Sequence, residues 1–379
     1  MCSVYITRLA KFLPNEPISN DDMESYLGMI DGKPSAGRRL VLHRNRIRSR
    51  YYALDKNGKP THTNAGMTAL AIAALFDGHP SAEAISMLCC GTTSPDQLLP
   101  SHASMVHGLL KAGPVETASF SGACCTGIQA LKYGFMAVAG GHTETAVCTG
   151  SERLSSWLKS GKYDQEAEKI RALEENGFVA FEKEFLRWML SDGAGAALLQ
   201  NQPGPGLSLK IEWIEQTSFA HELETCMYAG GVKDANGQLQ GWHEYEPREW
   251  LDQSLMSLQQ DVKLLGCHIV EKGQEFLNQI ILRRKLDMSS ISYFLPHLSS
   301  DFFRERIRAS LERAGMAIPE EKWFTNLSRV GNVGAASPYL MLEELFHSGK
   351  LKQGEHLLMM IPESARFSYS YVLLTVNQS

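Results

Sequence analysis

A strand, a turn of small residues and an amphipathic helix follow one another between residues 115 and 141. Residues 115–120 form a short apolar run, and apolar residues then recur at helical spacing over residues 128–138 until two glycines end the pattern. A strand that passes directly into a helix is typical of α/β layering. The sequence therefore predicts a strand-to-helix elbow, with Cys125 at the beginning of the helix.

The position of Cys125 suggests a nucleophile. Unpaired N–H groups and the positive end of the helix dipole favour a thiolate over a thiol, and they can also hold a developing oxyanion. A second interpretation stays open at this point, because cysteine is among the most buried residue types and a turn of Gly, Ala and Cys can simply pack tightly.

The clearest internal boundary is the Asn-Gln-Pro-Gly-Pro-Gly segment at residues 201–206. It predicts two similar halves, residues 1–200 and 207–379, and a charged, aromatic-containing insertion near residues 155–187. Each half alternates short apolar strands with helical patterns, which predicts an α/β fold. The expected strands are 85–90, 115–120, 145–149, 194–199, 291–295, 356–361 and 367–376, and an alternating pattern starts another at Leu207.

The composition of the 379 residues excludes several classes of protein. A charged fraction of 21% and a hydrophobic fraction of 44% are near globular averages, and the formal charge of −5 argues against nucleic-acid binding as the main activity. We expect a cytoplasmic protein without membrane insertion, since no signal core or spanning apolar run is present. The spacing of the eight cysteines predicts reduced thiols, and the scattered histidines predict no metal site.

Two further segments carry candidate side chains. His297 follows the expected strand 291–295, and Asn332 lies in a glycine turn before the apolar helical pattern at residues 340–346. Taken singly, such a histidine is more often a surface or core residue, and such an asparagine usually serves the turn. Together with Cys125 they provide a nucleophile and two side-chain donors for a carbonyl oxygen.

In this order the segments resemble the thiolase superfamily, and within it the β-ketoacyl-acyl-carrier-protein synthase III group. The resemblance covers nearly the whole chain. It is carried by Phe12-Leu13-Pro14 with Asn20-Asp21-Asp22, Arg46-Ile47-Arg48-Ser49-Arg50, Thr92-Thr93-Ser94, Ala123-Cys124-Cys125-Thr126-Gly127, Gly150-Ser151-Glu152, Ser191-Asp192-Gly193-Ala194-Gly195-Ala196, Pro296-His297, and Gly331-Asn332 with Ala335-Ala336-Ser337.

The resemblance implies a layered α-β-α-β-α fold, a homodimer and no cofactor. Substrates would arrive as phosphopantetheine thioesters on an acyl carrier protein or on coenzyme A. Cys125 would take the acyl group, while His297 and Asn332 would hydrogen-bond the carbonyl oxygen of the second thioester. Backbone N–H groups of Cys125 and of a turn near Ala365 would hold the oxyanion of the acyl-enzyme.

Departures from the family pattern suggest a specialised enzyme. Ser300 replaces the asparagine that follows the family histidine, and Pro362-Glu363-Ser364-Ala365-Arg366-Phe367 replaces a glycine-rich loop. The loop and Glu152 resemble ketosynthase/cyclases that make dialkylresorcinol or stilbene precursors through a cyclohexanedione. Glu152 and Arg366 would then assist cyclisation or position the substrate; alternatively, they form a structural ion pair or cap neighbouring backbone.

An arginine-rich stretch offers a docking surface for a carrier protein, with Arg46, Arg48 and Arg50 as the candidates. Alternatively, these side chains are simply exposed to solvent, as such charged stretches usually are. Three other functions stay open. These are a decarboxylative synthase III that starts fatty-acid or polyketide chains, a noncatalytic scaffold half of a heterodimeric ketosynthase, and a papain-like Cys-His-Asn hydrolase.

Overall fold

The computed structural model describes residues 2–35, 37–77, 85–162, 185–253 and 255–378. Within these ranges its main feature is a nine-stranded mixed sheet of order β13-β14-β15-β8-β1-β7-β6-β4-β5. These strands are β1 (Tyr5–Phe12), β4 (Met87–Thr92), β5 (Glu116–Ser121), β6 (Thr145–Glu152), β7 (Gly193–Gln200), β8 (Leu207–Ser218), β13 (Ile291–Pro296), β14 (His356–Glu363) and β15 (Ser368–Gln378). Short two-stranded pairs are β2 (Ile18–Ser19) with β3 (Ser49–Arg50), β9 (Met227–Tyr228) with β12 (Gln259–Gln260), and β10 (Gly231–Lys233) with β11 (Leu239–Gly241).

Strand pairing follows the same pattern on both sides of the join between β1 and β8. Going outward from β1, the pairs with β7 and then β6 are antiparallel, and β6 is parallel to β4. Going outward from β8, the pairs with β15 and then β14 are antiparallel, and β14 is parallel to β13. The sheet is continuous because β1 and β8 themselves pair antiparallel.

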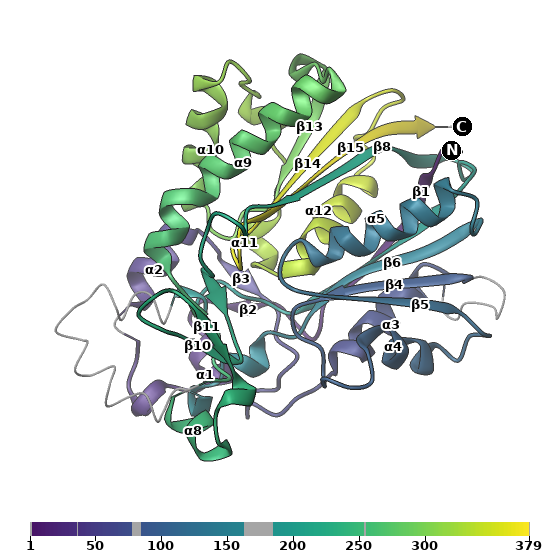
Figure 1. The fold of residues 1–379 in the computed structure, drawn as a ribbon. Coiled ribbons are helices and arrows are strands. Elements are labelled where there is room, and N and C mark those ends of the chain that lie inside the picture. Colours follow the sequence, from purple (N-terminus) through teal and green to yellow (C-terminus); the bar gives the residue numbers. More distant parts are fainter. Residues whose placement is uncertain (1, 36, 78–84, 163–184, 254, 379) are drawn as a thin grey trace.

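Helices cover both faces of this sheet and produce alternating layers (Figure 1). α5 (Thr126–Ala139) and α12 (Ser337–Phe346) lie in the middle layer, where α5 packs on β4 and β6, and α12 packs on β1 and β7. α3 (Asn64–Ala74) and α4 (His102–Leu110) cover the outer face of the N-terminal strands, and α9 (Val262–Arg284) and α10 (Phe302–Arg313) lie outside the C-terminal ones. The remaining helices are α1 (Met23–Leu27), α2 (Arg38–Asn45), α8 (Pro247–Asp252) and α11 (Leu327–Val330).

The expected strands and the helix after the cysteine elbow are all present, with ends shifted by a few residues. Residues 201–206 connect β7 to β8, where we predicted the boundary between halves; the division into two domains stays a prediction. Most of the predicted insertion, residues 163–184, lies outside the described residues. Of its described flanks, Phe185 is buried in the largest apolar cluster.

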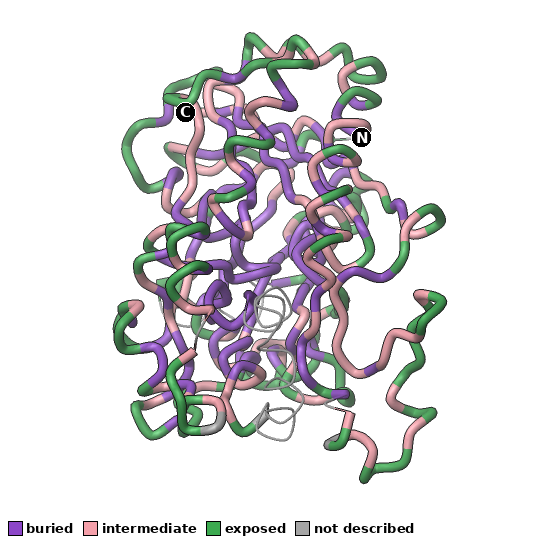
Figure 2. Tube along the Cα trace, turned by 90° about the vertical axis from the view of Figure 1, so that its left-hand side faces the viewer, coloured by how far each residue is buried: buried purple, intermediate pink, exposed green. Residues whose placement is uncertain are grey.

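Buried residues gather in the strands and the middle helices, whereas exposed residues occupy the outer loops (Figure 2). All eight cysteines lie in the described ranges as free thiols. In the part of the chain that the structure describes, no helix has the length and apolarity needed to cross a membrane, and no group of three or more His, Cys, Asp or Glu side chains is placed to hold a metal ion.

The turn before α12 approaches the backbone of β6 and of α5 so closely that a side chain at the contact positions would not fit. A Cβ atom at Gly150 on β6 would lie 2.1 Å from the carbonyl oxygen of Ala335, and one at Gly127 on α5 would lie 2.2 Å from the same oxygen. Ala335 belongs to a 3₁₀ turn, Gly334–Ala336, directly before α12. Both positions therefore require glycine, and this contact fixes the turn against the first residues of α5.

Replacement of Gly150 by alanine should move that turn and lower the free energy of unfolding by about 1–3 kcal/mol, as overpacking of a core does. Gly108→Ala is the matched control, because Gly108 is an exposed residue of α4 with open space around it. That change should raise stability by about 0.5–1 kcal/mol. Chemical denaturation measures both, and a Gly150→Ala variant as stable as the wild type would contradict the contact.

Candidate active site

Cys125 caps the N-terminus of α5, as the sequence predicted. The residue is 1% exposed. Its backbone N–H donates a hydrogen bond of 3.0 Å to Oε2 of Glu363, and its Sγ lies 3.3 Å from the carbonyl oxygen of Ile361. The end of β14 therefore lies directly against the beginning of α5.

The electrostatic state of Cys125 differs from the expectation of a stabilised thiolate. Burial raises the pKa of the Cys125 thiol well above its ordinary value, and the nearby Glu363 carboxylate raises it further. Both effects disfavour the charged form and outweigh the partial charge of the helix end. The expectation from the sequence was wrong because it considered the helix alone. In the resting site, Cys125 is a protonated thiol.

His297 directly follows β13, and its backbone N–H donates to the carbonyl oxygen of Met360 on β14. Burial lowers the pKa of His297 to about 4, so the imidazole is neutral at neutral pH. Among the described residues, its Nε2 atom is buried and has no hydrogen-bond partner. Buried polar atoms of this kind are rare, and an unpartnered one beside a cavity indicates a group that meets a ligand.

Asn332 is held by its backbone and by one end of its side chain. The backbone N–H donates to Met189, the carbonyl accepts from Ser191, and Oδ1 accepts from the N–H of Gly334 at 3.0 Å. Since Oδ1 is engaged, the Nδ2 group is the part of this amide that remains to donate. His297 and Asn332 therefore each keep an uncharged nitrogen for a ligand in the cavity that both residues line.

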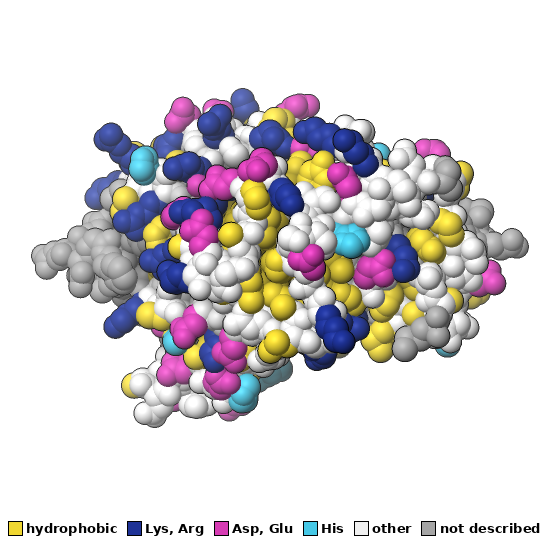
Figure 3. Space-filling view, turned by 90° about the horizontal axis from the view of Figure 1, so that it is seen from above, with side chains coloured by type: hydrophobic (Ala, Val, Ile, Leu, Met, Phe, Trp, Pro, Cys, Tyr) yellow, Lys and Arg dark blue, Asp and Glu magenta, His cyan; other side chains and the backbone are white. Residues whose placement is uncertain are grey.

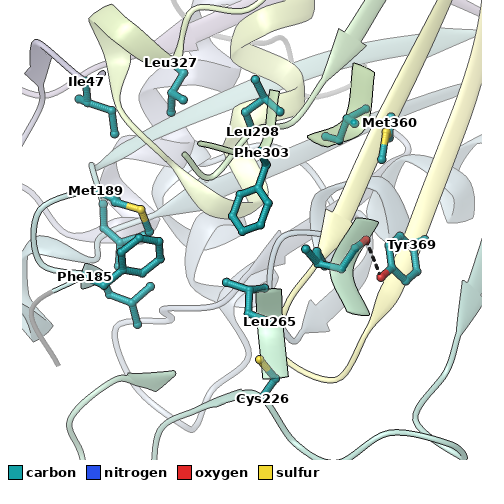
Figure 4. Packing of buried hydrophobic residues seen from close by; sticks show 14 of the residues in the cluster. Ile47, Phe185, Met189, Cys226, Leu265, Leu298, Phe303, Leu327, Met360 and Tyr369 are labelled. Carbon is teal, nitrogen blue, oxygen red and sulfur yellow. Dashed lines mark hydrogen bonds between the residues drawn. The ribbon is translucent and has the colours of Figure 1, made fainter. Parts of the chain in front are cut away.

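A cavity joins these segments. Cys124, His297 and Asn332 all line it; Cys125 itself does not, although the adjacent Ala123 does. The rest of the wall is mainly apolar and comes from α9, α10 and β14 and from the segments around residues 154, 186–190, 227, 258–260 and 298. Figure 4 shows the side chains that pack in this region, and those that also line the cavity include Leu265, Leu298, Phe303, Met360 and Met189.

Glu152 lies at the end of β6 and is fully buried. Its carboxylate accepts hydrogen bonds from the N–H and Oγ1 of Thr93, from Oγ of Ser94 and from the N–H of Ala335, at 2.6–3.1 Å. Burial raises its pKa, and these donors oppose that effect. The carboxylate therefore ties the turn after β4 to the turn before α12.

Arg366 does not meet Glu152. It is exposed in the turn between β14 and β15, and its Nε contacts the carbonyl oxygen of Leu223 at 3.4 Å. The structural ion pair considered from the sequence is not formed. In the same turn, the carbonyl of Ala365 accepts from the N–H groups of Cys226 and Met227, so this loop is anchored through its oxygen.

Arg50 does not belong to a docking surface, so this part of the prediction was wrong. It is fully buried on β3, where it contacts the Met23 sulfur and donates to Oδ1 of Asn20 at 2.8 Å. Burial lowers its pKa. Arg46 and Arg48 are exposed, and Arg46 pairs with Asp301 at 3.3 Å.

Sequence reasoning assigned no role to Glu363, although the altered loop contained it. Its contact with Cys125 depends on where β14 ends relative to α5, and no local sequence pattern gives that distance. The composition of the loop was the available signal: an acidic residue replaced part of a glycine-rich segment beside the expected oxyanion site.

The chain is similar to known condensing enzymes. Residues 281–361 match the family described as 3-Oxoacyl-[acyl-carrier-protein (ACP)] synthase III C terminal. The chain is 27% identical over 360 residues to the β-ketoacyl-[acyl-carrier-protein] synthase III of Chlorobaculum tepidum, with 94% of each chain covered. Among solved structures, it resembles AbyA1, a tetronic acid condensing enzyme, with a TM-score of 0.75, 20% identity and coverage of 98% and 99% of the two chains.

A second solved structure is Xanthomonas campestris OleA with bound lauric acid and lauroyl-CoA. Its TM-score is 0.74 at 18% identity, and 98% of this chain and 99% of that chain are covered. At identities of 20% and 18%, the two structures are evidence for the fold alone. The α/β fold of the thiolase type, which the sequence predicted, is confirmed.

The depressed pKa of His297 makes stability depend on pH. Between about pH 6.5 and 4 the unfolded chain binds a proton that the folded chain does not, so stability falls as the pH falls through this window. His297→Gln should reduce the loss of unfolding free energy between pH 7 and pH 5 by about 2 kcal/mol. Urea denaturation at both pH values measures this, with exposed His43→Gln as the control. Equal losses in wild type and His297→Gln would contradict the buried, neutral state.

Proposed function

We propose that this chain, a member of the β-ketoacyl-acyl-carrier-protein synthase III family of the thiolase superfamily and an acyltransferase that forms carbon–carbon bonds, uses Cys125, His297 and Asn332 to join two thioesters. One observation carries the assignment of these residues. The neutral His297 has a buried, unpartnered Nε2 at a cavity that Asn332 and Cys124, the residue before Cys125, also line.

The first step loads an acyl group on Cys125. The sulfur attacks the carbonyl carbon of a thioester, the new S–C bond forms, and the donor thiol leaves. The mainly apolar wall of the cavity suits a fatty-acyl chain, since burial of each methylene contributes about 0.8 kcal/mol. The second substrate then meets His297 and Asn332 through its thioester oxygen.

The second step forms the carbon–carbon bond. A carbon nucleophile next to the second thioester attacks the acyl carbonyl, and Cys125 leaves as the new bond forms. Negative charge develops on the oxygen of the second thioester, where Nε2 of His297 and Nδ2 of Asn332 would donate. A β-ketoacyl substrate supplies this carbon by losing a proton, whereas a malonyl substrate supplies it by losing carbon dioxide.

Ring closure to a cyclohexanedione, the precursor of a resorcinol, is the finer part of the proposal. It is supported by the replacement of the glycine-rich loop at residues 362–367. Neither of the two candidate helpers adds support, because the carboxylate of Glu152 is saturated with donors and Arg366 is exposed. A decarboxylative synthase that starts acyl chains is the second candidate. A noncatalytic scaffold is disfavoured by the intact Cys-His-Asn set.

An acyl carrier protein is the proposed carrier of the second substrate, and coenzyme A or a carrier delivers the first. Seen from above, the face over α9 and α10 carries basic and acidic side chains interspersed (Figure 3). Of the predicted docking residues, exposed Arg48 and Arg46 remain candidates, and the salt dependence of carrier-linked turnover measures their contribution.

We also propose a homodimer that pairs through the β5 edge of the sheet. Large apolar side chains are exposed in the segments next to this edge, on α4, α5 and the loop before α4. Exposed apolar surface of this kind is typical of association sites. Sedimentation equilibrium measures the mass, and a monomer would contradict this assignment. The side chains are Leu98, Leu99, Met105, Leu109, Tyr133 and Met136.

The adjacent cysteines provide the test of the nucleophile. Incubation with an acyl-CoA should add one acyl mass to the wild type and to Cys124→Ala, and none to Cys125→Ala. Cys124→Ala is the matched control, since Cys124 lines the cavity but precedes the helix cap. An adduct that persists in Cys125→Ala would refute the assignment.

Product analysis by mass spectrometry then follows the second, carrier-linked substrate in the same reactions. A cyclic product is expected from a β-ketoacyl thioester. A linear β-ketoacyl product instead would refute ring closure and leave the carbon–carbon bond-forming step intact.

A further inference from the structure

Glu363 is a buried carboxylate at the nucleophile that the steps above do not use. It is the last residue of β14, and its side chain is 7% exposed. Its Oε2 accepts the backbone N–H of Cys125 at 3.0 Å, and the Sγ atom of Cys125 lies 3.3 Å from the carbonyl oxygen of Ile361, two residues before Glu363 on the same strand. The carboxylate is thus held at the first residue of the catalytic elbow.

The surroundings of Glu363 are those of a proton acceptor. In the described part of the chain, no Lys, Arg or His side chain pairs with it, and backbone N–H groups of Cys125 and Ala123 are the donors that stabilise its charge. Burial raises its pKa, which brings the carboxylate closer to the range of a general base. Glu152, the other buried carboxylate of the site, is saturated by side-chain donors and differs in this respect.

The position of Glu363 also creates a conflict. The N–H of Cys125 is the donor that an acyl-enzyme oxyanion needs, and in the resting site the carboxylate occupies it. Two negative oxygens cannot share one N–H group without strong repulsion. The carboxylate must lose its charge, or leave, before the thioester oxygen can bind there.

We propose that Glu363 accepts the thiol proton of Cys125 during acyl transfer, and that its neutralisation releases the Cys125 N–H to the thioester oxygen. The inference rests on the proposed acylation of Cys125. The proton moves from Sγ to the Glu363 carboxylate, the S–C bond to the acyl carbon forms, and the donor C–S bond breaks. The protonated carboxyl then gives its proton to the departing thiolate, so the carboxylate is restored and all atoms balance.

Glu363→Gln separates this role from others, because glutamine has nearly the same shape and its oxygen can still accept the Cys125 N–H, but it cannot take the proton. Two rates are measured at pH 7: acylation by an acyl-CoA, followed by intact mass, and alkylation of Cys125 by iodoacetamide. Acylation should fall about 100-fold. Alkylation should become about three to ten times faster, since removal of the negative charge lowers the thiol pKa.

Opposite changes in the two rates are the expected signature. Both rates slower would indicate a structural role, and both rates unchanged or faster would indicate that Glu363 only adjusts the thiol; either result overturns the proposal. Glu355→Gln, a carboxylate directly before β14, is the matched control and should change neither rate more than about twofold.

A second variant covers the case in which Glu363→Gln does not unfold cooperatively. Glu363→Asp keeps the acid group but draws it back by one methylene, so acylation should be slower than in the wild type while alkylation stays within about twofold. Unchanged acylation in Glu363→Asp would then overturn the proposal. A wild type that forms no adduct would instead refute the proposed function itself.

Discussion

The close contact at the carbonyl of Ala335 fixes the arrangement of the site. Gly127 and Gly150 both meet this oxygen, so the turn before α12 lies against α5 and β6 without intervening side chains. Tyr339 adds a buried hydrogen bond of 2.8 Å from its hydroxyl to the Gly127 carbonyl. The turn also follows Asn332 closely in the chain, and the start of α5 carries Cys125. One packing contact therefore sets the distance of the turn before α12 from α5 and β6, which lie about 200 residues earlier in the chain.

The polar groups around the cavity divide into two kinds. The first kind is saturated by the protein: Glu152 is held by donors from two turns, and Oδ1 of Asn332 is held by Gly334. The second kind keeps unused capacity, as the Nε2 atom of His297 does. A buried polar atom without a partner costs about 1–3 kcal/mol, and a hydrogen bond to a bound ligand would remove this cost.

Much of the fold and part of the site could be predicted from the sequence. Apolar runs bounded by glycine and proline marked the strands, and Cys125 and His297 were correctly placed at a helix start and after a strand. Local patterns carry that information. Local patterns do not give the distances between elements. The approach of Glu363 to Cys125, for example, depends on how far β14 extends. The sequence also did not reveal how deeply each side chain is buried. The predictions of a stabilised Cys125 thiolate and of an exposed Arg50 were wrong for that reason.

Part of the cavity wall comes from elements that carry none of the proposed catalytic residues. Leu265 and Ile269 lie on α9, and Phe303 and Ile307 lie on α10, outside the C-terminal strands, whereas the donors follow β13 and precede α12. A change of side-chain size on either helix alters the room for an acyl chain without moving a catalytic group. If the proposed function holds, substitutions on these two helices would change which substrates fit while the bond-forming residues stay constant, so related proteins with this architecture could differ in product without differing in chemistry.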